Sequence, residues 1–245
     1  ASKSLGENFL SKVFEVHHKH KKDHPSGTAL MLGKGIAVGK KKDFHKLSGK
    51  KYLNKNHVII IRSSIYPGVS NKIFNIIKNR CKNLSYCPER IAQGKSLLEL
   101  PKLSQIISGK NSKARIESGK IFKKVCKKII YTKIIEAELI KLFSNAYRYI
   151  NFSISNQFYL ICKNQGLDFF KIRNLMRDNY KRNADIPLAG FTAGPCLLKD
   201  TMQLSSFYNH KFPLFHDAMS INESLPRFII NKLNEKYNLK KNKIK

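Results

Sequence analysis

The sequence predicts an α/β region followed by an all-helical region, and two features carry that prediction. Val58-Ile59-Ile60-Ile61 is a continuous apolar, β-branched run, typical of a strand buried on both faces. The turn Tyr66-Pro67-Gly68 follows it, and apolar residues then recur at helical spacing over 70–79. Residues 134–164 contain neither Gly nor Pro, and their apolar residues recur every three or four positions, as in a long amphipathic helix.

The α/β region shows a second strand–helix step. Ile106-Ile107 ends at Ser108-Gly109, a helix is expected over 111–127, and a short strand is expected over 128–131. Two such steps predict a parallel α/β layer.

The helical region continues beyond the long helix. Gly166 stands at a C-cap-like position, and a Gly- and Pro-rich loop is expected over 187–195. Further helices are expected over 168–180, 199–208 and 216–237. The predicted domains are a basic leader (1–56), the α/β part (57–132), the helical part (133–237) and a basic tail (238–245).

The chain is strongly basic, with 47 Lys and Arg against 16 Asp and Glu in 245 residues, a net charge of +31. Such a charge first suggests a polyanion partner, since Lys and Arg gain affinity by releasing phosphate counterions. The charge is spread along the chain, with +9 in residues 1–56, +17 in 57–231 and +5 in 232–245. This spread favours a general compositional bias over one nucleic-acid surface.

Several protein classes are disfavoured. The 42% hydrophobic content allows a folded core, and no window is apolar for the ~18 residues that a membrane span needs. The first residues lack the apolar core of a signal peptide, and five Cys leave an odd thiol under any pairing. We therefore expect a cytoplasmic protein.

The leader holds two weak motifs. The tract from His17 to His24 has four His interleaved with Lys and no Cys nearby, which favours a solvated basic loop over a metal site. Gly33-Lys34-Gly35 and Gly39-Lys40 resemble a phosphate loop, but the sequence holds neither G-x-G-x-x-G nor G-x-x-x-x-G-K-[ST].

Three sets of residues could carry chemistry. Cys196 follows Gly194-Pro195 where a helix begins, and the helix dipole and Lys199 would favour its thiolate, although an inert half-buried Cys fits equally. Lys141 and Asn145 share one helix face and could stabilise an oxyanion, although an ordinary solvated face has the same pattern. Pro88-Glu89 could lie where α/β sheets bind ligands, or simply form a turn.

Together these segments resemble the nucleotide-sugar 6-dehydrogenases, the family of UDP-glucose and UDP-N-acetylmannosamine dehydrogenases. The resemblance covers about 57–236, with the pieces in family order. They are IIRSSIYPGVSNKIF (60–74), CPERIAQGKSLLELPKLSQIISG (87–109), EAELIKLFSNAYRYINFSISNQF (136–158), GLDFFKI (166–172), GFTAGPCLLKDTMQL (190–204) and INESLP (221–226).

The resemblance implies a partial Rossmann-like layer, a central helical domain that pairs subunits, and two oxidations of a UDP-sugar C6 alcohol by NAD. It implies that Cys196 is the nucleophile, that Lys141 and Asn145 support the oxyanion, and that Asp200 assists proton transfer or orients Lys141. Ser64 and Lys199 would lie at the cofactor. The implied substrate-binding residues are Glu89, Arg90, Phe191 and Gly194.

The sequence departs from the family pattern in three places. Gln93 stands where many members carry a Glu that helps to activate water, and an amide cannot accept that proton. The family's opening strand with its Gly-rich turn is not recognisable, nor is its C-terminal nucleotide-sugar-binding domain. We therefore expect an internal fragment with an unrelated or frame-shifted leader. No metal site is expected.

Two other functions stay open at this stage. One is a non-catalytic helical module that dimerises through the apolar seam from Leu139 to Phe158. The other is a basic polyanion-binding protein, as the net charge suggests.

Overall fold

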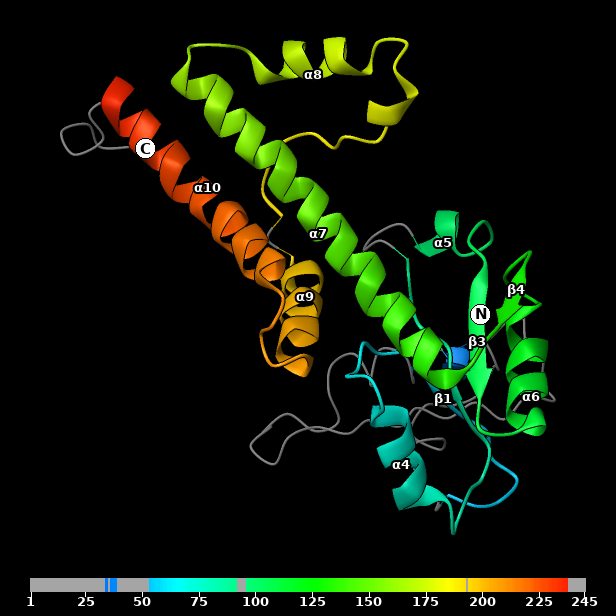
Figure 1. The fold of residues 1–245 in the computed structure, drawn as a ribbon. Coiled ribbons are helices and arrows are strands. Elements are labelled where there is room, and N and C mark those ends of the chain that lie inside the picture. The colour runs from blue at the N-terminus through cyan, green and yellow to red at the C-terminus, as the bar shows by residue number, and fades with distance from the viewer. Residues whose placement is uncertain (1–33, 35, 39–52, 92–95, 193, 238–245) are drawn as a thin grey trace. The chain divides into compact units, whose positions relative to one another are not determined.

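The computed structural model describes residues 34, 36–38, 53–91, 96–192 and 194–237, and they form two compact units (Figure 1). The first unit includes 69–137 and the strand that ends before Ser63. The second includes 138–237 together with the short segment Ser64–Gly68. The His17–His24 tract, the glycines of the 33–40 segment, Gln93 and the basic tail lie outside the described residues.

The first unit holds a four-stranded sheet in the order β1-β2-β3-β4, formed by Ile59–Ile61, Leu84–Tyr86, Gln105–Gly109 and Ile129–Tyr131. Its helices are α4 (Val69–Ile77), the one-turn α5 (Ser96–Glu99) and α6 (Ser112–Phe122). Asn111 caps α6 by accepting a hydrogen bond from the Ala114 N–H. Cys87, Ile107 and Phe122 form the core, with Ile60 and Ile129 packed against them.

The expectation of a wholly parallel layer was wrong in one pairing. β1 pairs with β2 and β3 with β4 in parallel, but β2 and β3 are antiparallel. A parallel return needs a crossover that covers one face of the sheet, usually with a helix. The connection from β2 to β3 contains only the four-residue α5 among its described residues, so the chain turns back on itself.

Strand β2 was not predicted, because it has three residues and Ser85 interrupts its apolar character. All three residues are nevertheless buried. Ser85 is tolerated there because its Oγ donates to the Ala114 carbonyl at 2.9 Å and accepts from Ser118 Oγ at 2.9 Å.

The second unit is built on α7 (Ile134–Asn164), whose bounds match the predicted helix. Gly166 ends it in the left-handed region (φ +69°), and the Leu167 N–H donates to the Cys162 carbonyl at 2.8 Å. The remaining helices are α8 (Phe169–Arg177), the 3₁₀ turn η1 (Lys181–Asn183), α9 (Pro195–Phe207) and α10 (Pro213–Tyr237).

Helices α7, α9 and α10 pack together within this unit (Figure 1). Leu142 and Ala146 of α7 meet Leu204 of α9, with Leu139 and Phe215 at the edge of the cluster. The predicted class, an α/β layer followed by a helical domain on one long helix, is confirmed. Within the described residues, no helix combines the length and apolar character that membrane crossing requires.

Candidate functional site

Cys196 lies in the first turn of α9 and is exposed, whereas Cys81, Cys87, Cys126 and Cys162 are buried. Gly194 is the N-cap with extended backbone (φ −121°, ψ 149°), and Pro195 stands in the first turn, where its missing N–H costs no hydrogen bond. The helix therefore begins four residues earlier than predicted. This exposure leaves the thiol of Cys196 accessible to a substrate.

Asp200 lies four residues after Cys196 on α9 and is fully buried. Its Oδ2 accepts hydrogen bonds from Ser64 Oγ at 2.9 Å and from Asn145 Nδ2 at 2.6 Å. Its Oδ1 pairs with Lys199 Nζ. The carboxylate thus joins the 64–68 segment, α7 and α9, and its burial is possible because a cation and two donors satisfy it.

The 64–68 segment has a second anchor on α7. Gly68 has φ +88°, which favours glycine, and its N–H donates to Glu138 Oε2 at 2.6 Å. Glu138 is fully buried. Ser64 is therefore held beside Asp200 from both ends of its turn.

Lys141 and Asn145 lie one helical turn apart on α7. Asn145 is buried, and Lys141 is partly buried. Since an amide nitrogen carries two hydrogens, the bond from Asn145 to Asp200 leaves a second N–H that an oxyanion could use.

The loop before α9 is held by amide groups. Asn156 of α7 is fully buried, accepts from the Gly190 N–H at 2.8 Å and donates to the Gly190 carbonyl at 3.1 Å. It also donates to Asn222 of α10 at 2.8 Å, and Asn222 donates to the Tyr149 carbonyl. The loop that carries the exposed Phe191 and leads to Gly194 is thereby fixed to two helices.

Glu89 and Arg90 lie in the first unit, just after β2. Glu89 Oε2 pairs with Arg62, whose other nitrogen donates to Gln105 Oε1 at 3.2 Å. Arg90 donates to the Ser104 carbonyl at 2.5 Å. The cavity beside them has a volume of about 10 Å³, room for one water at most. The role of Glu89 and Arg90 in substrate binding stays a prediction.

The structure thus brings together Asn145, Asp200, Lys199 and Ser64, with Cys196 one turn along α9. Lys199 contacts Asp200, while its predicted place at the cofactor stays a prediction. Sequence reasoning missed two residues that hold the loops of this site, Glu138 and Asn156, and it also missed Arg62, which pairs with Glu89 in the first unit. An acidic residue and an amide on the apolar side of α7 were the only signals for the first two, and both side chains also occur on solvated faces.

Two family models match most of the chain between residues 47 and 224. The NAD binding domain of the UDP-glucose/GDP-mannose dehydrogenase family matches residues 47–130, and the central domain of the same family matches residues 135–224. This region of the chain belongs to that family. The resemblance inferred from the motifs is therefore confirmed.

Individual relatives agree with this assignment. UDP-N-acetyl-D-mannosamine dehydrogenase of Methanococcus vannielii is 31% identical over 182 residues, which are 74% of this chain and 42% of that protein. The solved UDP-D-ManNAc dehydrogenase of Pyrococcus horikoshii superposes with a TM-score of 0.69 at 26% identity, covering 86% of this chain and 50% of that one. The Staphylococcus aureus UDP-N-acetyl-mannosamine dehydrogenase gives 0.63 at 28% identity, covering 76% and 45%. The chain thus spans about half the length of these relatives or less.

The leader is similar in sequence to a different family. Residues 1–82 match a model of the dihydrodipicolinate reductase C-terminus. A stretch of 54 residues, 22% of this chain, is 78% identical to 4-hydroxy-tetrahydrodipicolinate reductase of Pelagibacter ubique and covers 21% of that protein. The chain therefore joins segments similar to two families. The His tract and the glycines of the leader do not indicate this relation.

The match to the NAD binding domain makes NAD the cofactor of this family region. The parallel pairs β1–β2 and β3–β4 fit the layer that such a domain needs. The sequence holds no G-x-G-x-x-G turn to cradle the pyrophosphate. The residues present therefore fit only part of an NAD site.

Proposed function

We propose that the dehydrogenase region belongs to an enzyme that oxidises the C6 alcohol of a UDP-sugar to the carboxylate in two steps. The observation that carries this proposal is the buried Asp200 carboxylate, held by Ser64, Asn145 and Lys199, one helical turn from the exposed Cys196. A thiol, an amide, cations and an orienting carboxylate are the groups that acyl-enzyme chemistry requires. The similarity to UDP-N-acetyl-D-mannosamine dehydrogenases makes UDP-N-acetyl-D-mannosamine the first substrate to test.

In the proposed mechanism, bound NAD would supply the hydride acceptor for each oxidation. Cys196 Sγ adds to the C6 aldehyde left by the first oxidation, forming a C–S bond, while the carbonyl oxygen takes a proton to give a thiohemiacetal. Loss of the C6 hydrogen as hydride and of the hydroxyl proton leaves a thioester. Water then adds to the thioester carbon and the C–S bond breaks. One proton of the water returns to the sulfur of Cys196, the other goes to solvent, and the carboxylate product leaves.

The remaining residues stabilise the developing negative charge and hold the hydrogen-bond donors in position. Lys141 and the second N–H of Asn145 stabilise the oxygen anion that forms when sulfur or water adds to the carbonyl carbon. Asp200 fixes the amide of Asn145 through a short hydrogen bond and holds the hydroxyl of Ser64. Its rigid burial keeps these donors in place while charge develops.

The test offers the full chain NAD with UDP-N-acetylmannosamine or UDP-glucose and follows NADH, with Cys196→Ser as the matched control. A second measurement needs no cofactor: mass spectrometry of the intact chain under non-denaturing conditions, after incubation with the UDP-sugar C6 aldehyde, detects the thiohemiacetal adduct of Cys196. We expect one adduct, lost in Cys196→Ser. Absence of both NADH and the adduct would contradict catalysis by this chain.

A helical pairing function is the second candidate, because α7 presents exposed apolar side chains along its length. Phe143, Tyr147, Phe158 and Ile161 are between 36% and 58% exposed. We propose that this face pairs two copies of the chain. Sedimentation equilibrium checks it: the dimer should weaken in Phe143→Glu, and a monomer at all accessible concentrations would contradict it.

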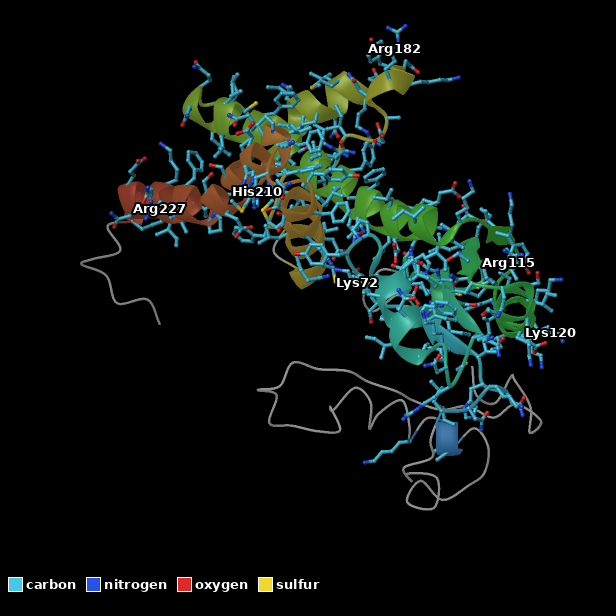
Figure 2. All side chains as sticks on the ribbon, turned by 60° about the horizontal axis from the view of Figure 1, so that its bottom comes forward. Lys72, Arg115, Lys120, Arg182, His210 and Arg227 are labelled. Atoms are coloured by element: carbon cyan, nitrogen blue, oxygen red, sulfur yellow. The ribbon has the colours of Figure 1, made fainter. Side chains whose placement is uncertain are left out.

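The polyanion alternative is less favoured by the distribution of cations. In each unit, basic side chains point outward from several elements (Figure 2). Examples are Lys72, Arg115 and Lys120 in the first unit and Arg182 and Arg227 in the second. Such a spread predicts weak, salt-sensitive DNA binding that no single Lys cluster controls.

A cytoplasmic location remains part of the proposal, in keeping with five free cysteines.

A further inference from the structure

The turn between α9 and α10 brings two histidines and a serine together. Ser205 lies in the last turns of α9 and is fully buried, His210 lies in the turn, and His216 lies in the first turn of α10. His210 is exposed (Figure 2), and His216 is half-buried. Asn209 and His210 both have positive φ, +53° and +56°, an uncommon backbone for two successive residues other than glycine.

The polar atoms of the three side chains form a nearly equilateral triangle. His210 Nδ1 lies 2.9 Å from His216 Nε2, and Ser205 Oγ lies 3.2 Å from the first and 3.1 Å from the second. The rings are 5.0 Å apart between centroids and inclined by 46°, so they do not stack face to face.

Hydrogen bonding alone satisfies this triangle poorly. Each ring nitrogen carries either a hydrogen or a lone pair, directed along one line in the plane of its ring. Each of the two ring nitrogens takes part in two of the three contacts, so its single hydrogen or lone pair would have to be shared between them. If both ring nitrogens carried hydrogens, these would face each other across 2.9 Å.

A cation at the centre of the three atoms resolves that conflict, because every atom then offers it a lone pair. Ligand atoms about 2.0–2.1 Å from a tetrahedral Zn²⁺ are about 3.3 Å from one another, close to the three distances found here. Imidazole nitrogens are suited to Zn, Cu and Ni. Water can complete the coordination, since His210 is exposed.

We propose that His210, His216 and Ser205 form a binding site for a late first-row divalent metal ion such as Zn²⁺. In the described part of the chain, no three His, Cys, Asp or Glu side chains gather around a common point, so the third protein ligand is the serine hydroxyl. The bound ion links the end of α9 to the start of α10. It thereby steadies the helix that carries Cys196 and Asp200, but its binding does not depend on the proposed enzymatic activity.

The test measures Zn²⁺ binding to the full chain by equilibrium dialysis, together with the Zn²⁺-dependent rise of the melting temperature. His210→Asn removes the imidazole but keeps a residue that tolerates positive φ, and His216→Gln keeps a good helix former. We expect each variant to weaken one Zn²⁺ site at least about tenfold, because even outer partners of metal ligands are worth 10–100-fold in affinity. Ser205→Ala should weaken it less.

Two control variants separate this site from other zinc ligands in the chain. Replacing His17, His18, His20 and His24 by Ala should leave the site and its thermal shift in place, and so should Cys196→Ser. The proposal is overturned if the unmodified chain binds no Zn²⁺ or if His210→Asn and His216→Gln bind it as tightly as the unmodified chain. It is also overturned if the His17–His24 replacement alone abolishes binding and the thermal shift.

Discussion

Each unit of the chain places a cysteine beside a carboxylate, but in opposite environments. In the first unit Cys87 is fully buried and Glu89, two residues later, has a side chain that is 42% exposed. In the second unit Cys196 is exposed and Asp200, four residues later, is fully buried. The same pair of residue types therefore serves packing in one unit and suits chemistry in the other.

The contrast shows which environment each group needs. A nucleophilic thiol must reach its substrate and ionise, and burial raises the pKa of Cys87 to about 12 despite the opposing effect of Arg62. An orienting carboxylate must hold its donors rigidly, which Asp200 does with Ser64, Asn145 and Lys199. Glu89 is instead bound to Arg62 at a solvated surface.

The largest expected effect is on thiol reactivity. In the native chain at pH 8, iodoacetamide should label Cys196 at least about a thousandfold faster than Cys87, because a pKa near 12 leaves about one part in ten thousand of Cys87 as thiolate. Peptide mass spectrometry over a time course measures both rates. Comparable labelling rates at Cys196 and Cys87 would contradict the difference in environment between the two thiols. The Cys196→Ser variant shows which label belongs to which site.

Removing the buried carboxylate should cost stability. Asp200→Ala leaves the buried amide of Asn145 and the hydroxyl of Ser64 without their acceptor, so we expect unfolding to become easier by about 3 kcal/mol. Urea denaturation followed by circular dichroism measures the loss. Asp200→Asn, which still offers an oxygen acceptor, should lose less, and an equal loss in both variants would argue that shape alone matters.

Alkaline pH should destabilise the first unit through Cys87. Its pKa is about 12 when folded and near 9 when unfolded, so the unfolded chain releases its proton first. The stabilising contribution is complete below pH 9 and declines by about 1.4 kcal/mol per pH unit as the pH rises from 9 toward 12. Cys87→Ala should show a shallower decline over pH 9–10.5, and an identical slope in both proteins would contradict the burial of this thiol.

The smallest effect is expected at Glu89. Its ion pair with Arg62 is solvated on both sides, with 31% and 42% of the side chains exposed, so screening limits its contribution to under about 1 kcal/mol. Glu89→Ala should therefore lower stability much less than Asp200→Ala, and the small loss should shrink in 1 M NaCl. A loss as large as that of Asp200→Ala would show that the two carboxylates are equivalent.

Local sequence patterns were enough to predict the elements with strong periodicity. The bounds of α7 followed from a run without Gly or Pro, and the strands β1, β3 and β4 followed from β-branched runs. The family followed from ordered motifs around Cys196, Lys141 and Asn145. These features are local, so neighbouring residues suffice to specify them.

Contacts between residues far apart in the chain could be found only in the folded structure. Ser64 and Asp200 are 136 positions apart, and nothing in either segment encodes that the hydroxyl donates to the carboxylate. The antiparallel pairing of β2 with β3, the burial of Glu138 and the triangle of Ser205, His210 and His216 are likewise invisible in local patterns. A buried polar group is stable only where its partners are, and those partners come from segments that the fold alone brings together.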